Sequence, residues 1–81
     1  MLSHSVFPNH YNSLIQMTRR RKKDQTCYAR FTLKNNSYIT KDIIKDVVED
    51  YVRDCVIFQM VWFSKNREKI YQKSYVTFKP L

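Results

Sequence analysis

Clustered cations and tyrosines are the side chains of this 81-residue sequence that could do chemistry at a surface. The tightest cluster is an unbroken basic run of Arg19, Arg20, Arg21, Lys22 and Lys23. The formal net charge is +8, which favours a polyanionic partner such as nucleic acid, an acidic protein face or an anionic lipid surface. The run suits either a solvated tail or an arm that grips phosphates or directs nuclear import.

Metal-binding and redox motifs are poorly supported. Cys27 and Cys55 have no close cysteine neighbour, and His4 and His10 stand in a stretch without ligand spacing. We therefore expect two reduced core cysteines and no metal site. The chain contains no glycine, which excludes Walker-type phosphate loops, dinucleotide fingerprints and EF-hand loops.

Patterning divides the chain in two. Residues 1–25 show neither helical nor strand periodicity, so we expect a flexible basic arm ahead of one small domain at residues 26–81. The longest apolar run, Cys55 to Phe63, is far shorter than the roughly 20 residues of a membrane-spanning helix. No signal-peptide pattern opens the sequence. We expect an intracellular protein that contacts no membrane.

The domain has four expected elements. Alternation predicts a strand from Thr26 to Lys34, with its apolar face formed by Cys27, Ala29, Phe31 and Leu33. Thr40 is a good N-cap for an amphipathic helix over residues 41–54. The run from Cys55 to Phe63 is apolar on both faces, which predicts a strand buried on both sides. A third strand follows from Lys69 to Lys79.

The order strand, helix, strand, strand predicts an α+β fold. In this βαββ unit the three-stranded antiparallel sheet has the order 1-3-2, with the helix packed on one face. The first strand would keep a bare edge, through which a homodimer could form. Four side chains would share the exposed face of the sheet, as cations for phosphates and rings for bases: Arg30, Tyr71, Lys73 and Tyr75. They suit ordinary solvent-facing strand positions equally well.

Short strings in this domain resemble motifs of viral Rep proteins, the rolling-circle replication endonucleases of CRESS-DNA viruses. The run Phe31, Thr32, Leu33, Lys34, Asn35, Asn36 is similar to the family's first motif, close to Phe-Thr-Leu-Asn-Asn, here interrupted by a lysine. Gln59 matches the end of the second strand, and Tyr75 to Lys79 matches the tail of the second motif. The resemblance spans Thr26 to Lys79 and implies an HUH-like or RRM-like half domain acting in DNA replication, in the nucleus of a host cell.

The resemblance also implies a nickase that uses magnesium or manganese, but its ligands are missing. Tyr71 stands where the family has a metal-binding histidine, and Lys73 where it has a glutamine. Met60 or Val61 stands where an acidic ligand is expected, and the motif of the nucleophilic tyrosine is absent. A lysine at the site would also repel a metal ion. We expect a truncated, degenerate Rep-like chain with no catalytic residue, metal or cofactor.

Three functions remain open at this level. The first is a Rep-like protein that binds single-stranded or duplex DNA without nicking it. The second is a small viral or host-interaction protein that binds another protein through its sheet edge or its acidic helix face. The third is a metal-dependent nuclease with a noncanonical site.

Overall fold

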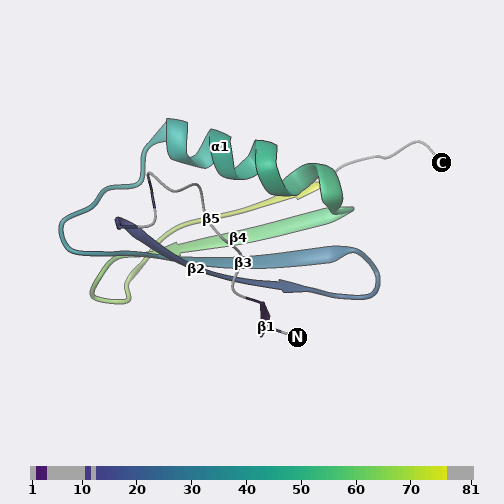
Figure 1. Ribbon diagram of the computed structural model, residues 1–81, viewed down its shortest axis with the longest axis horizontal. Coiled ribbons are helices and arrows are strands. Elements are labelled where there is room, and N and C mark those ends of the chain that lie inside the picture. The colour runs from purple at the N-terminus through teal and green to yellow at the C-terminus, as the bar shows by residue number, and fades with distance from the viewer. Residues whose placement is uncertain (1, 4–10, 12, 77–81) are drawn as a thin grey trace.

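The computed structural model describes residues 2–3, 11 and 13–76, which form a mixed sheet with one α-helix. The strands lie side by side in chain order: β1 (Leu2–Ser3), β2 (Ile15–Arg21), β3 (Thr26–Leu33), β4 (Ile57–Phe63) and β5 (Lys69–Val76). The β3–β4 pair is parallel, and the other neighbours are antiparallel. Helix α1 (Lys41–Tyr51) and a 3₁₀ helix (Val52–Asp54) connect the two parallel strands (Figure 1).

Helix α1 begins where the sequence predicts. The Thr40 hydroxyl accepts a hydrogen bond from the amide of Ile43 at 3.3 Å, which satisfies one of the free amides of the first turn. Ile43, Val47 and Tyr51 recur every four residues and are buried against the sheet. The predicted N-cap and the apolar face of the helix are confirmed.

The core lies between α1 and one face of the sheet (Figure 1). The four side chains predicted for the apolar face of the first strand are buried there: Cys27, Ala29, Phe31 and Leu33. From β4, Phe58, Met60 and Trp62 point the same way and are at most 1% exposed. The rings of Phe31 and Trp62 are cross-strand neighbours and stack with centroids 4.2 Å apart.

The predicted strand order 1-3-2 is wrong. Among the described strands, the final strand β5 pairs only with β4, at the edge of the sheet, and β3 and β4 pair directly. Most side chains of β5 are exposed, whereas those of β3 and β4 facing α1 are buried. Strands with a continuous apolar face belong in the centre, because they bury that face under the helix. A polar strand is better placed at the edge.

A flexible arm over residues 1–25 is also wrong for its last part. Ile15–Arg21 forms β2, whose register with β3 runs from the Ile15–Leu33 pair to the Arg21–Cys27 pair. Ile15 and Met17 are buried in the core. Therefore β3 is paired on both sides, and the bare edge that suggested a homodimer does not exist on that strand.

The strand β4 is not buried on both sides as predicted. Ile57, Val61 and Phe63 point away from α1 and are only partly buried, because no described element covers that face. The outer face of β4 therefore presents apolar side chains to a surface that the rest of the described chain leaves open.

The two cysteines form a disulfide, contrary to the expectation of reduced thiols. Cys27 and Cys55 have a Cα–Cα distance of 6.1 Å, and both are fully buried. The crossover through α1 returns the chain to β3, where the amide of Val56 donates a hydrogen bond to the carbonyl of Gln25 at 3.0 Å. The Cys27–Cys55 disulfide closes a long loop that contains most of β3, α1 and the 3₁₀ helix.

Replacing both cysteines with alanine should lower the free energy of unfolding by about 3–4 kcal/mol, because the bond closes a loop with a sequence separation of 28. Urea denaturation followed by the fluorescence of Trp62, the single tryptophan, measures the change. A reductant should destabilise the parent chain and leave the double variant unaffected. Equal stability of the oxidised and reduced parent chain would contradict this role.

Candidate functional site

The sheet face turned away from α1 is called the open face. Alternation and strand register assign to it Gln16, Thr18 and Arg20 of β2; Tyr28, Arg30 and Thr32 of β3; Ile57, Gln59, Val61 and Phe63 of β4; and Gln72, Ser74 and Val76 of β5. Three cross-strand rows organise it: Gln16–Thr32–Phe63, Thr18–Arg30–Val61–Gln72 and Arg20–Tyr28–Gln59–Ser74. Each row brings side chains from separate parts of the chain to one surface.

Charge is divided between the two sides of the molecule. No acidic residue stands at any open-face position, whereas Arg20 and Arg30 are exposed there. Of the seven acidic residues, five belong to α1 and the 3₁₀ helix, and Asp24 and Glu68 lie in hairpin turns at opposite ends of the sheet. The open face therefore carries positive charge without neutralising carboxylates.

Two aromatic rings on the open face each have a cation above them. The Arg30 guanidinium lies 5.1 Å from the ring centroid of Phe63, and the Lys22 ammonium lies 5.1 Å from that of Tyr28. Both rings are partly buried, so the sheet holds them in place while part of each stays accessible. A ring beside a cation offers stacking and charge at the same spot.

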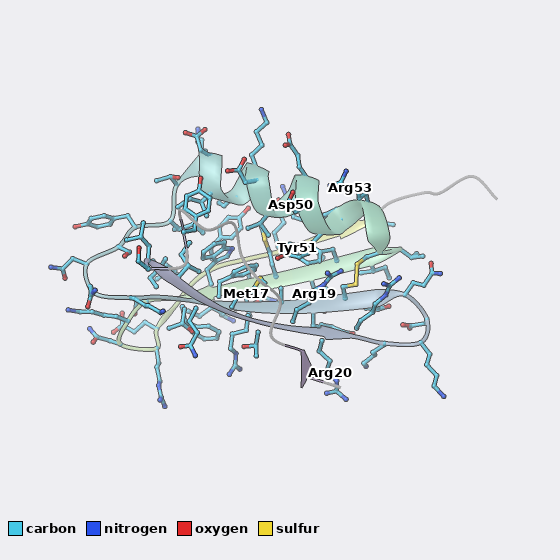
Figure 2. The ribbon with its side chains drawn as sticks, in the orientation of Figure 1. Met17, Arg19, Arg20, Asp50, Tyr51 and Arg53 are labelled. Carbon is cyan, nitrogen blue, oxygen red and sulfur yellow. A yellow bond between two sulfur atoms is a disulfide. The ribbon has the colours of Figure 1, made fainter. Side chains whose placement is uncertain are left out.

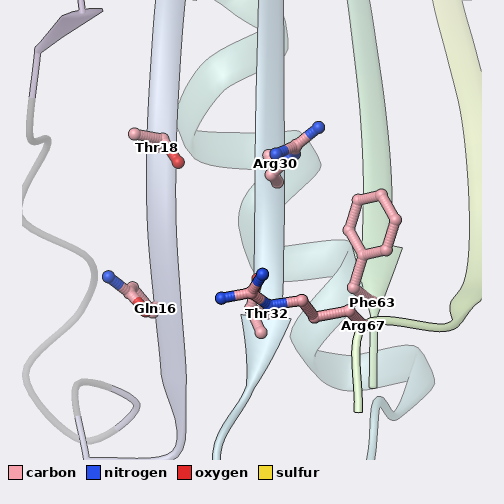
Figure 3. A pocket seen from close by; sticks show the side chains of 6 residues that line it. All are labelled: Gln16, Thr18, Arg30, Thr32, Phe63 and Arg67. Carbon is pink, nitrogen blue, oxygen red and sulfur yellow. The ribbon is translucent and has the colours of Figure 1, made fainter. Parts of the chain in front are cut away.

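A hollow of about 390 Å³ lies at the β4–β5 turn end of the open face (Figure 3). Its walls are polar and basic with one ring: Gln16, Thr18, Arg30, Thr32, Phe63 and Arg67. Arg67 comes from the β4–β5 turn and has a φ of 66°, which bends the turn tightly. A second hollow of about 260 Å³ continues past Arg30 toward Arg20 and Tyr28. The two hollows share Thr18 and Arg30 in their walls, so they adjoin on β2 and β3.

Neighbouring arginines of the basic run lie on opposite faces of β2 (Figure 2). Arg20 points away from α1, whereas Arg19 lies between the sheet and the helix. The guanidinium of Arg19 lies 4.6 Å from the Tyr51 ring centroid, and its Nη2 atom is 3.5 Å from the sulfur atoms of both Cys27 and Cys55. Burial raises the pKa of Tyr51, and the Arg19 charge partly opposes that rise. Arg19 is therefore part of the packing under the helix.

The other members of the basic run are also separated. Arg21 alternates to the α1 side, and Lys22 reaches the open face through its contact with Tyr28. Lys23 is exposed in the β2–β3 turn. There the Asp24 carboxylate accepts a hydrogen bond from the amide of Thr26 at 3.0 Å, which lowers the pKa of Asp24. Of the five predicted cations, Arg20 and Lys22 belong to the open face.

The predicted group of Arg30 with Tyr71, Lys73 and Tyr75 is not brought together. Register places the last three on the α1 side of β5, opposite Trp62, Met60 and Phe58, whereas Arg30 lies on the open face. Tyr71 and Tyr75 pack against the edge of the core. Burial raises the pKa of Tyr75, and its interaction with Tyr71 adds to the rise.

The residues that carry the Rep resemblance are divided in the same way. Phe31 and Leu33 are core residues, Thr32 and Gln59 belong to the open face, and Asn35 and Asn36 form the turn after β3. Asn35 has a φ of 55°, a conformation that asparagine adopts more readily than most residues. The last part of the second-motif match, residues 77–79, lies outside the described residues, as do His4 and His10.

Sequence reasoning missed Tyr28, Phe63 and Arg67 as members of a surface. Alternation alone places Tyr28 on the polar side of its strand, where it has no predicted partner. Phe63 belongs to the strand that the sequence predicts to be buried on both sides. The sequence signal for Phe63 is the second apolar face of β4. An apolar face that no described element covers is typical of an interaction surface. Arg67 had no signal, since its position depends on the turn.

Within residues 2–3, 11 and 13–76, no group of three or more histidine, cysteine or acidic side chains could hold a metal ion. In the same part of the chain no helix is both long and apolar enough to cross a membrane. The open face offers cations, rings, amides and hydroxyls, which are groups that bind ligands.

Comparison with protein-family models found no match, and comparisons with curated proteins and with solved structures found none either. The surface is therefore interpreted from its own geometry. The strand order 1-3-2, predicted from the order of the elements, is wrong, and the Rep resemblance stays a prediction from short strings.

Arg19 and Arg20 provide a matched pair for separating packing from surface charge. Arg19→Ala should lower the free energy of unfolding by about 1–2 kcal/mol, because it removes a partly buried cation–ring contact and the packing of its stem. Arg20→Ala should change it by less than about 0.5 kcal/mol, as surface substitutions usually do. Urea denaturation of both variants measures the difference, and equal effects would contradict the assignment.

Proposed function

We propose that this protein binds nucleic acid on the open face of its sheet, without cutting it. The segregation of charge carries the proposal: exposed arginines stand on a face without carboxylates, while most acidic residues lie on the helix side. Phosphate backbones bind most strongly where cations are not already neutralised by neighbouring acids. The open face is the described surface that meets this requirement.

The helix is a poor candidate for the same task. Its exposed side carries Asp42, Glu49 and Asp50 among its lysines, so it would repel a phosphate backbone where the open face attracts one. One carboxylate of the helix, Asp46, accepts a hydrogen bond from the Tyr11 hydroxyl at 2.9 Å. These observations support an orientation in which α1 points away from the nucleic acid.

The proposal does not rest on the Rep resemblance. It also includes no nicking step, because nicking needs a bound divalent metal and an activated nucleophile, and no described cluster supplies the metal ligands. DNA replication, a nuclear site and an intracellular location stay predictions. Disulfides persist mainly in oxidising compartments, so the Cys27–Cys55 bond counts against the predicted intracellular location.

Protein binding through a sheet edge or the acidic helix face is the alternative class. Strands β1 and β5 form the two edges of the described sheet. On β5, Lys69 and Lys73 disfavour pairing with a second copy, because antiparallel self-pairing would bring like charges together. The bare edge of β3 that the sequence predicted is paired with β2. A homodimer through a sheet edge therefore has less support than it had from the sequence.

Affinity for nucleic acid should fall steeply with salt, and the slope should depend on open-face arginines. In Arg30→Ala and Arg67→Ala the slope of log K against log salt should become shallower by about 0.7–0.9 for each arginine removed. The reason is that binding releases fewer counterions from the nucleic acid when it forms one phosphate contact fewer. Fluorescence anisotropy with labelled oligonucleotides, between about 50 and 200 mM salt, measures the slope.

Lys41→Ala and Lys45→Ala are the matched controls, since both lysines are exposed on α1 and carry the same charge. These variants should bind almost as the parent chain does. Binding that does not respond to salt, or that weakens equally in the helix variants, would overturn the proposal.

A further inference from the structure

The open face carries more kinds of side chain than the binding of a polyanion requires. Among its cations stand the rings of Tyr28 and Phe63 and the exposed amides of Gln16, Gln59 and Gln72. Phosphates require only positive charge, whereas rings and amides match the faces and edges of bases. Groups for all three parts of a nucleotide therefore lie on one surface.

Resting on the proposed function, we infer that the occupant of the open face is a single-stranded nucleic acid whose bases stack on Phe63 and Tyr28. Arg30 and Arg67 flank the hollow beside Phe63, and Lys22 and Arg20 flank Tyr28. Each ring thus has cations next to it that can bind the phosphates on either side of a stacked base.

The spacing of the two rings favours separate, unstacked bases. Phe63 and Tyr28 belong to the first and third cross-strand rows, so they are about 13 Å apart along the strand direction, at roughly 3.3 Å per residue. Neighbouring bases in a duplex are only about 3.4 Å apart. Two bases on these rings are therefore not stacked on each other. A base that stacks on either ring must also free its own face from its neighbours, which a single strand permits and a duplex does not.

The width of the face argues against a duplex in the same way. The four strands β2 to β5 span about 14 Å between their outer axes at the usual spacing of about 4.8 Å, before side chains are added. The major groove of B-DNA is about 12 Å wide and admits a helix or a two-stranded ribbon. A four-stranded sheet is therefore too broad to enter the major groove in the way a helix or a two-stranded ribbon does.

The test is an anisotropy titration of the full chain with labelled oligo-dT, oligo-U and a mixed-sequence duplex at one salt concentration. Single strands should bind at least about ten-fold more tightly than the duplex. Phe63→Leu and Tyr28→Leu should each weaken single-strand binding by about ten-fold and leave weak duplex binding unchanged, because leucine keeps apolar volume but has no face for a base. Oligo-dU, compared with oligo-U, distinguishes DNA from RNA, because the two differ only in the 2′-hydroxyl.

Tyr38→Leu is the control, since Tyr38 is 80% exposed in the loop between β3 and α1 and lies off the open face. It should bind as the parent chain does. Thermal denaturation of each variant identifies any loss of binding that comes from unfolding, and Phe63→Tyr, which keeps a ring, should retain binding.

Each other outcome counts against a specific claim. Equal binding of duplex and single strands, with the leucine variants unaffected and the arginine variants weakened, would overturn this inference and leave the proposed function standing. No binding of any oligonucleotide would overturn both. A stable dimer by sedimentation that Phe63→Leu converts to monomer would show a second copy on the open face and also overturn the inference.

Discussion

The arrangement depends on one constraint: among the described residues one α-helix covers one face of the sheet and leaves the other face open. The parallel pairing of β3 with β4 forces the connection between them over one face, and α1 buries its apolar side there (Figure 1). Every inward-facing side chain of β3 and β4 is then part of the core. The outward-facing ones stay at least partly exposed, except Thr26 at the start of β3, which is buried. The same register that aligns Phe31 with Trp62 inside aligns Thr32 with Phe63 outside.

The β2–β3 hairpin extends both faces of the sheet by one strand. Alternation along β2 gives consecutive arginines opposite roles, because Arg19 enters the space under the helix and Arg20 joins the open face (Figure 2). A continuous basic run in sequence thus becomes a structural cation and a surface cation in the fold. Arg19 connects β2 to the helix, because its guanidinium lies over the Tyr51 ring and beside the sulfur atoms of the disulfide.

Local patterns predicted the elements better than their neighbours in the sheet. Strict alternation in β3 and helical spacing in α1 were sufficient, and the Thr40 cap marked the start of the helix. Strand β2 was missed because only Ile15 and Met17 carry its alternation before the arginines obscure it. The predicted strand order was wrong because pairing depends on which faces must be buried together. The polar side chains of β5 are the feature of the sequence that is typical of an edge strand. The disulfide depends on a distance that the sequence does not contain.

The candidate surface was only partly predictable for the same reason. Arg20, Lys22 and Arg30 were predicted to bind nucleic acid, the first two in a flexible arm and Arg30 on the sheet. The tyrosines predicted to share a face with Arg30, Tyr71 and Tyr75, lie on the α1 side of β5. The rings that the structure places beside these cations come from other positions, and one of them, Phe63, belongs to a strand expected to be fully covered. A correct strand order was required before any residue could be assigned to the open face.

The central claim is that nucleic acid contacts the open face and not the helix. An NMR titration of the isotopically labelled chain with a single-stranded oligonucleotide tests this most directly, because it reports each residue separately. The account predicts that the side-chain resonances of Arg30, Phe63 and Gln59 shift together on saturation while those of Lys41 and Lys45 stay in place. Shifts confined to α1, or spread evenly over both faces, would contradict it.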